Sequence, residues 1–161
     1  MAEILGVDVG GVIIDRVNDN TDTSLFSDNY LATTAVPGAF EALARLTAGR
    51  FGGQVFLVSK CGARVEAKTR EWLHHHDFHA RTGIPAGHLH FCRRRPDKAG
   101  ICERLGVTHF IDDRLEVLGY LDTVTNLYLF RPDAREMKRH TRHLVQVEIM
   151  DSWDAVLDRL L

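Results

Sequence analysis

Five polar residues each stand at or shortly after the end of an apolar run, and their side chains together could carry out phosphoryl transfer. They are Asp8, Ser59, Lys98, Asp112 and Asp113. Carboxylate oxygens suit Mg²⁺, which keeps some positions for water or substrate oxygens. A carboxylate can also attack phosphorus, while a hydroxyl and an ammonium can hold the phosphoryl oxygens as charge shifts in the transition state.

The elements that must position these side chains are short apolar strands that alternate with helices. Strands are expected near residues 4–8, 54–58, 88–92, 107–111, 126–130 and 144–149. Helices are expected from Pro37-Gly38 to Gly49, over 63–77, up to Gly106, over 114–122, in the basic stretch after Pro132 and from Ser152. This alternation predicts a doubly wound, Rossmann-like α/β fold with a parallel sheet and helices on both faces. Because parallel strands end at one edge, the five side chains should meet in one crevice.

The segment after the first strand has a different character. Gly10 and Gly11 allow a tight departure of the backbone behind Asp8. Residues 15–36 are polar, lack periodicity and are rich in turn formers, so we expect a loop or flap there. This flap is too short to be a cap domain, and residues 1–161 are expected to form a single domain with little or no cap.

Overall composition indicates a protein of the cytoplasm. The hydrophobic fraction is 45%, the formal net charge is −2, and no apolar run approaches the roughly 20 residues that span a bilayer. The acidic start Met1-Ala2-Glu3 does not resemble a signal peptide. Cys61, Cys92 and Cys102 are too few and too scattered for a disulfide framework, so reduced thiols are expected, with Cys61 in a structural role.

In this order, the motifs resemble those of the haloacid dehalogenase-like (HAD) superfamily. Asp8 in Val-Asp-Val-Gly-Gly-Val matches the nucleophile motif, Ser59 matches the hydroxyl of the second motif, and Lys98 matches the lysine of the third. The run His109-Phe110-Ile111-Asp112-Asp113 matches the acidic fourth motif. The resemblance covers about residues 3 to 131. Any one motif is unspecific, whereas four in order at strand ends are specific together.

Most members of this superfamily are Mg²⁺-dependent phosphohydrolases, so the resemblance implies that activity and that cofactor. It implies that Asp8 is the nucleophile and a metal ligand, with the main-chain carbonyl of Gly10 and the carboxylate of Asp112 as further ligands. Asp113 would bind the ion through water or orient Lys98. Pro37-Gly38, Trp72-Leu73 and the ending Asp112-Asp113-Arg114 look most like the 5′(3′)-deoxyribonucleotidase-type branch, which makes nucleotides the first substrates to consider.

The chain departs from the family's pattern at Gly10, where phosphatases of the superfamily usually carry a second aspartate. That aspartate protonates the leaving group and later activates water, work typically worth about 10²–10⁴-fold in rate. We therefore expect a phosphohydrolase that is slow, restricted to good leaving groups, or supplied with a proton by Asp15, Asp19 or Asp22. The alternatives are a non-catalytic module that binds Mg²⁺ and phosphate, and another transfer or nucleic-acid-processing reaction.

Other clusters have simpler explanations. The histidines at 74–76 and 79 are expected to be a solvated helix end rather than a metal site. The basic stretch 131–143 lacks the interleaved aromatic residues of a single-strand binder and is expected to be a solvated face. Arg93–Arg95 could extend the phosphate-binding field or form a plain surface loop. Expected partners are a small phosphorylated substrate or a phosphorylated macromolecule, with no membrane, and a second copy of the chain could lend a cap.

Overall fold

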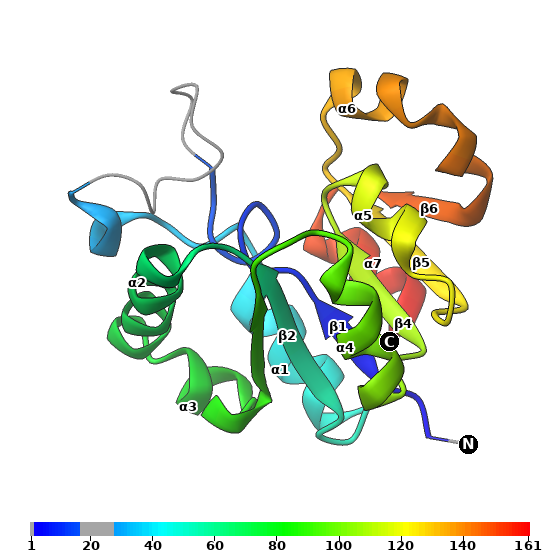
Figure 1. The fold of residues 1–161 in the computed structure, drawn as a ribbon. Coiled ribbons are helices and arrows are strands. Elements are labelled where there is room, and N and C mark those ends of the chain that lie inside the picture. The colour runs from blue at the N-terminus through cyan, green and yellow to red at the C-terminus, as the bar shows by residue number, and fades with distance from the viewer. Residues whose placement is uncertain (1, 17–27) are drawn as a thin grey trace.

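A computed structural model describes residues 2–16 and 28–161, and over these residues it contains one parallel sheet (Figure 1). Its strands are β1 (Leu5–Val7), β2 (Val55–Lys60), β3 (Leu89–Cys92), β4 (His109–Asp112), β5 (Asn126–Phe130) and β6 (Val147–Met150). They lie in the order β3-β2-β1-β4-β5-β6, with every neighbouring pair parallel. The doubly wound α/β fold predicted from the sequence is confirmed.

The strand register brings the polar ends of the strands together. Val7 of β1 pairs with Leu57 of β2 on one side and with Ile111 of β4 on the other. Asp8 therefore follows β1 level with Asp112, which closes β4, and one residue before the level of Ser59, which ends the buried run of β2. Since the strands run parallel, these positions share one edge of the sheet.

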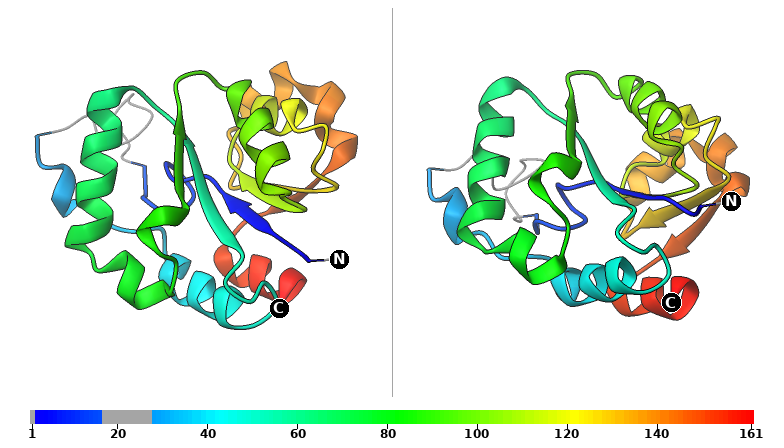
Figure 2. Two further views of the ribbon diagram at one scale, coloured as in Figure 1. Left: turned by 60° about the horizontal axis from the view of Figure 1, so that its bottom comes forward. Right: turned by 90° about the horizontal axis from the view of Figure 1, so that it is seen from below.

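Helices cover both faces of this sheet. They are α1 (Ala39–Ala48), α2 (Ala63–His75), α3 (Phe78–Thr82), α4 (Asp97–Leu105), α5 (Leu115–Tyr120), α6 (Ala134–Arg139) and α7 (Trp153–Leu160). One apolar core lies between the sheet and α1, α2, α3 and α7, and a second lies under α4 and α5. Figure 2 shows α1 and α7 together on one face of the sheet. None of the described helices is long and apolar enough to cross a membrane.

Several boundaries differ from the sequence-based expectation. The helix expected over 63–77 ends at His75. Asp77 then takes a left-handed conformation (φ 54°), and a separate short helix that was not expected, α3, follows over Phe78–Thr82. The strand expected from Leu144 begins only at Val147, since residues Thr141–Gln146 form a 3₁₀ helix. Gly106 adopts the left-handed conformation that ends α4, as its position predicted.

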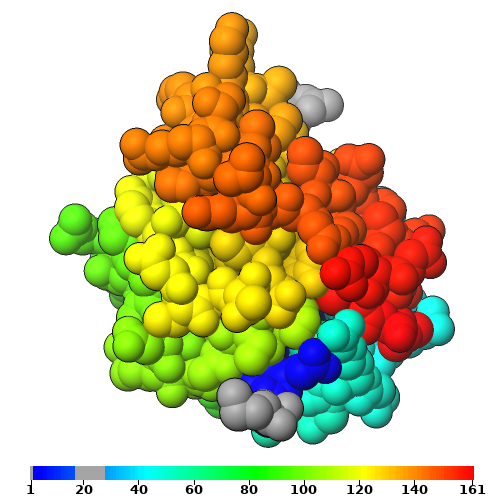
Figure 3. Space-filling model, turned by 90° about the vertical axis from the view of Figure 1, so that its right-hand side faces the viewer, coloured from blue at the N-terminus to red at the C-terminus, as the bar shows by residue number. Residues whose placement is uncertain are grey.

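Residues 134–146, between β5 and β6, extend away from the sheet. Figure 3 shows α6 and the following 3₁₀ helix, in orange, as a projection on this side of the molecule. Four of its basic residues are exposed, which agrees with the solvated face expected for this stretch. They are Arg135, Lys138, Arg139 and Arg142.

The expected flap at 15–36 falls partly outside the described residues, which omit 17–27. Its two described ends are held together beside the site. Asp15 N–H donates to the carbonyl of Thr34 (2.9 Å), and Val36 N–H donates to that of Ile13 (2.8 Å). The returning end contains a 3₁₀ helix, Tyr30–Ala32, and docks on α2, where the Trp72 indole donates to the carbonyl of Thr33 (3.0 Å).

Candidate active site

Asp8 stands directly after β1, at the start of a tight loop. Its own N–H donates to the carbonyl of Ile111 in β4 (2.9 Å), which fixes the backbone at this point. The chain then turns back on itself, because the N–H groups of Val12, Ile13 and Ile14 all lie within hydrogen-bond distance of the Val9 carbonyl. The apolar residues after the two glycines are therefore buried in this loop and do not prolong the strand.

Lys98, from the first turn of α4, joins the two carboxylates that end β1 and β4. Its Nζ donates to Asp8 Oδ1 and to Asp112 Oδ2, each at 2.9 Å, and the lysine side chain is only 3% exposed. Burial alone would lower the pKa of Lys98, but the charges of Asp112 and Asp8 together raise it above its ordinary value. Lys98 is therefore a fixed positive charge at the carboxyl edge of the sheet.

Asp112 is the most deeply buried of the three carboxylates, with 1% of its surface exposed. Burial first, and then the neighbouring charge of Asp8, raise its pKa to about 7, although Lys98 opposes the rise. Its Oδ1 accepts a hydrogen bond from the N–H of Arg114 (3.0 Å), which orients the carboxylate. One lysine does not fully offset two buried negative charges, so this position favours a further cation.

Asp113 contacts a different partner from its neighbour. Its Oδ2 forms an ion pair with Arg16, the last described residue before the gap in the flap.

The start of α5, just after Asp113, is held by a residue of α6. The Glu136 carboxylate accepts hydrogen bonds from the N–H groups of Leu115 (2.7 Å) and Glu116 (2.9 Å). Glu136 thus caps the start of α5 from a distant part of the chain. Nothing in the sequence pattern indicated this contact.

The three carboxylates suit a divalent cation. Asp8, Asp112 and Asp113 each offer an oxygen, and these oxygens all lie within 4.8 Å of one another. Oxygen donors of this kind are what Mg²⁺ prefers. Asp8 and Asp112 together carry more negative charge than Lys98 offsets, and a bound cation would balance the excess. The residue types and their spacing therefore fit Mg²⁺.

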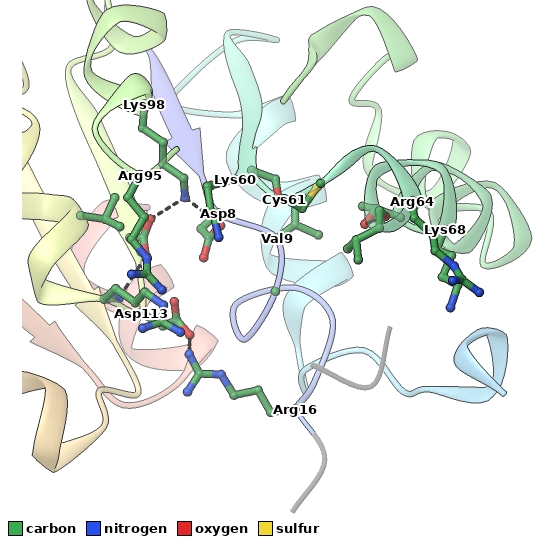
Figure 4. Close-up of a pocket in the computed structure, with 18 residues that line it drawn as sticks. Asp8, Val9, Arg16, Lys60, Cys61, Arg64, Lys68, Arg95, Lys98 and Asp113 are labelled. Atoms are coloured by element: carbon green, nitrogen blue, oxygen red, sulfur yellow. Dashed lines mark hydrogen bonds and ion pairs between the residues drawn. The ribbon is translucent and has the colours of Figure 1, made fainter. Parts of the chain in front are cut away.

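All the residues expected to act together line one pocket of about 420 Å³ (Figure 4). Ser59 is buried at its wall near the end of β2, beside Cys61. The sequence predicted that these side chains lie together at one edge of the sheet, and the structure places them there. It also predicted that Arg93–Arg95 could contribute, and of these only Arg95 lines the pocket.

Sequence reasoning missed most of the positive charge of this pocket. Among the described residues, seven basic side chains line it, against three carboxylates; the basic ones are Arg16, Lys60, Arg64, Lys68, Arg95, Lys98 and Arg114. A signal was present in the sequence. Lys60 follows Ser59 directly, and Arg64 and Lys68 are four residues apart in the helix that begins there, so they share one helix face.

The two glycines after Asp8 differ sharply in their surroundings. A Cβ at Gly10 would meet no atom within 4 Å among the described residues, so a side chain has room there. A Cβ at Gly11 would collide with Asp113 and approach Arg16 Nε to 2.7 Å, and Gly11 also has a positive φ of 81°. Gly11 is required by the fold, whereas the absence of a side chain at Gly10 is not imposed by space.

Two of the histidines at 74–79, one just after α2 and one in α3, contact main-chain carbonyls. His76 Nε2 lies 2.8 Å from the Leu31 oxygen, and His79 Nδ1 lies 2.7 Å from the Ile84 oxygen. Among the described residues, none of these histidines belongs to a group that could hold a metal ion. His76 and His79 therefore connect segments of the fold.

The cysteines are buried thiols. Burial raises the pKa of Cys61, and a hydrogen bond with Ser59 only partly opposes this rise. Burial likewise raises the pKa of Cys102 to about 12. These thiols stay protonated near neutral pH, as the structural role expected for Cys61 requires.

No protein-family model matches the sequence, and no curated protein matches it. A solved structure does resemble this chain: that of a protein from Burkholderia xenovorans LB400, described provisionally as a haloacid dehalogenase-like hydrolase. The match has a TM-score of 0.59 and 16% sequence identity, and it covers 84% of this chain. This chain therefore shares its fold with that protein. It spans 62% of the length of the Burkholderia protein, and at this level of identity the likeness shows the fold alone.

Proposed function

We propose that this HAD-like protein is a Mg²⁺-dependent phosphohydrolase that forms an aspartyl-phosphate at Asp8. The observation that carries the proposal is the contact of Lys98 with both Asp8 and Asp112, 2.9 Å each, in a pocket rich in basic side chains. Asp8, the Gly10 carbonyl, Asp112 and Asp113 would hold the ion. When bound, Mg²⁺ offsets the negative charge of the phosphoryl oxygens and so allows an anionic nucleophile to approach.

In the first step, an Asp8 oxygen attacks phosphorus, and the bond from phosphorus to the leaving oxygen breaks with its electron pair on that oxygen. Ser59 and Lys98 hold the phosphoryl oxygens during this transfer. In the second step, water attacks phosphorus and the bond from phosphorus to the Asp8 oxygen breaks. The Asp8 carboxylate is regenerated, inorganic phosphate is released, and a proton of the water passes to solvent. Asp8 thus splits one difficult displacement into two easier ones.

Gly10 limits both steps, because it has no group to protonate the leaving oxygen or to activate water. Leaving groups that are stable as anions, such as aryl oxides and carboxylates, need no proton and should react best. This limitation also favours a second candidate function, a non-catalytic module that keeps Mg²⁺ and a phosphorylated ligand in the pocket.

Turnover of an aryl phosphate with Mg²⁺ tests the proposal. We expect wild type to be active, the Asp8→Asn variant to be inactive, and Asp122→Asn, which changes an exposed aspartate after α5, to match wild type. If wild type binds Mg²⁺ and phosphate without turnover, the binding module replaces the phosphohydrolase. If Mg²⁺ does not bind at all, both functions are excluded.

A further inference from the structure

The pocket continues past Asp8 along α2, where its wall is basic. Lys60 ends β2, and Arg64 and Lys68 follow one helical turn apart near the start of α2. In Figure 4, Arg64 and Lys68 lie to the right of Asp8, whereas Arg95 and Asp113 lie to its left. Arg64 and Lys68 on α2 and the carboxylate of Asp113 are therefore on different sides of Asp8, beside which Lys60 is drawn.

Lys60 and Arg64 differ from other basic residues nearby in what they contact. Arg70 and Arg93 both pair with Glu66, at 3.1 Å and 2.9 Å, and neither lines the pocket. Over the described parts of the chain, no carboxylate lies within ion-pair distance of Lys60 or Arg64. Glu66 thus neutralises Arg70 and Arg93 outside the pocket, whereas no acidic group of the described residues pairs with Lys60 or Arg64 inside it.

Lys68, four residues after Arg64 on α2, has an aromatic contact. Its ammonium lies 5.0 Å from the centre of the Tyr30 ring, on the described end of the flap. Like charges four residues apart on a helix, such as Arg64 and Lys68, repel each other and destabilise the helix slightly. An anionic group of a ligand between them would remove that cost.

The reacting phosphoryl group already has Lys98, Ser59 and the candidate metal site for its charge, so the wall on α2 has no part in the first step. We propose that the substrate carries a second anionic group, a phosphate or a carboxylate, that binds to Lys60, Arg64 and Lys68. This proposal rests on the phosphohydrolase function, whose substrate class it names. A guanidinium binds either anion through two parallel hydrogen bonds.

The size of the pocket limits the rest of the substrate. A volume of about 420 Å³ lies within the range of roughly 300–1,000 Å³ that holds small organic ligands. The substrate is then a small molecule with two separated anionic groups, of which the one near Asp8 is a phosphate monoester or acyl phosphate. The second group belongs to the part that leaves.

Binding of unreactive phosphonates with Mg²⁺ tests this inference by calorimetry. The probes are alkylphosphonates and α,ω-alkane bisphosphonates of increasing chain length, with ω-carboxyalkyl phosphonates to distinguish a carboxylate from a phosphate as the second group. We expect at least one two-anion probe to bind about 10- to 100-fold more tightly than the alkylphosphonate of equal length, the gain typical of charged hydrogen bonds.

The double variant Lys60→Gln/Arg64→Gln should lose this gain. Arg70→Gln, on the same helix but outside the pocket, should keep it. The inference is overturned if no chain length binds more tightly than the alkylphosphonate, or if the gain survives in the double variant. Phosphonates are not hydrolysed, so their binding can be measured whether or not the protein is an enzyme. If a two-anion probe binds more tightly but the protein does not turn over an aryl phosphate, the phosphohydrolase function is refuted and the second anion site is supported.

Discussion

Lys98 donates a hydrogen bond of 2.9 Å to Asp8, and both side chains are buried. The same ammonium bonds Asp112, so its removal would leave two carboxylates in the protein interior without their counter-charge. We predict that Lys98→Ala lowers the free energy of unfolding by about 3–5 kcal/mol, the usual cost of breaking a buried ion pair on one side. Urea unfolding followed by circular dichroism measures this loss.

Lys138→Ala provides the control for that measurement, because Lys138 is exposed on α6. Its effect should stay within about 0.5 kcal/mol, as for most surface substitutions. A Lys98→Ala protein as stable as Lys138→Ala would contradict the account of Lys98 as the counter-charge of both carboxylates.

The open space at Gly10 leads to a gain-of-function prediction. An aspartate has room there, because a Cβ would meet no described atom within 4 Å. Gly10→Asp should therefore raise the turnover of alkyl phosphates, which need a protonated leaving group, by as much as about 10²–10⁴-fold. Aryl phosphates should gain less. Gly10→Asn, similar in size but without an acid, should bring no such gain, and an equal gain in both variants would argue against acid catalysis.

The neighbouring glycine should behave in the opposite way. Gly11→Ala forces a side chain into the left-handed region and against Asp113, so we expect a loss of at least about 1–2 kcal/mol in the free energy of unfolding. Gly10→Ala is the matched control and should change it by less than about 0.5 kcal/mol. Urea unfolding of the two variants measures both changes. Similar losses in the free energy of unfolding for Gly11→Ala and Gly10→Ala would contradict the left-handed conformation of Gly11 in the loop behind Asp8.

The sequence predicted the sheet and the edge where the site lies because buried parallel strands leave a simple pattern. Asp8, Ser59 and Asp112 each end an apolar run, and parallel pairing then brings them together without further information. Lys98 was found in the same way, since it begins the helix after the next strand.

What the sequence did not predict depends on contacts between distant residues. Glu136 reads as one more charge in a basic helix, yet it is buried and caps α5. The ion pair of Arg16 with Asp113 likewise joins the flap to β4 across a long stretch of chain. Helix α3 shows a local failure, because the sequence predicted one helix ending near residue 77 and no further short helix over Phe78–Thr82 after the left-handed Asp77.

The phosphorylated state of Asp8 is the most direct test of the proposed reaction. Because Gly10 cannot activate water, the second step should be slow, and wild type mixed with Mg²⁺ and an aryl phosphate, then quenched in acid, should carry a phosphoryl group on the peptide that contains Asp8. Mass spectrometry of that peptide should show less of the adduct in Gly10→Asp, which clears it faster, and none without Mg²⁺. Turnover by wild type that persists in Asp8→Asn, or a phosphoryl group found on another residue, would contradict the account.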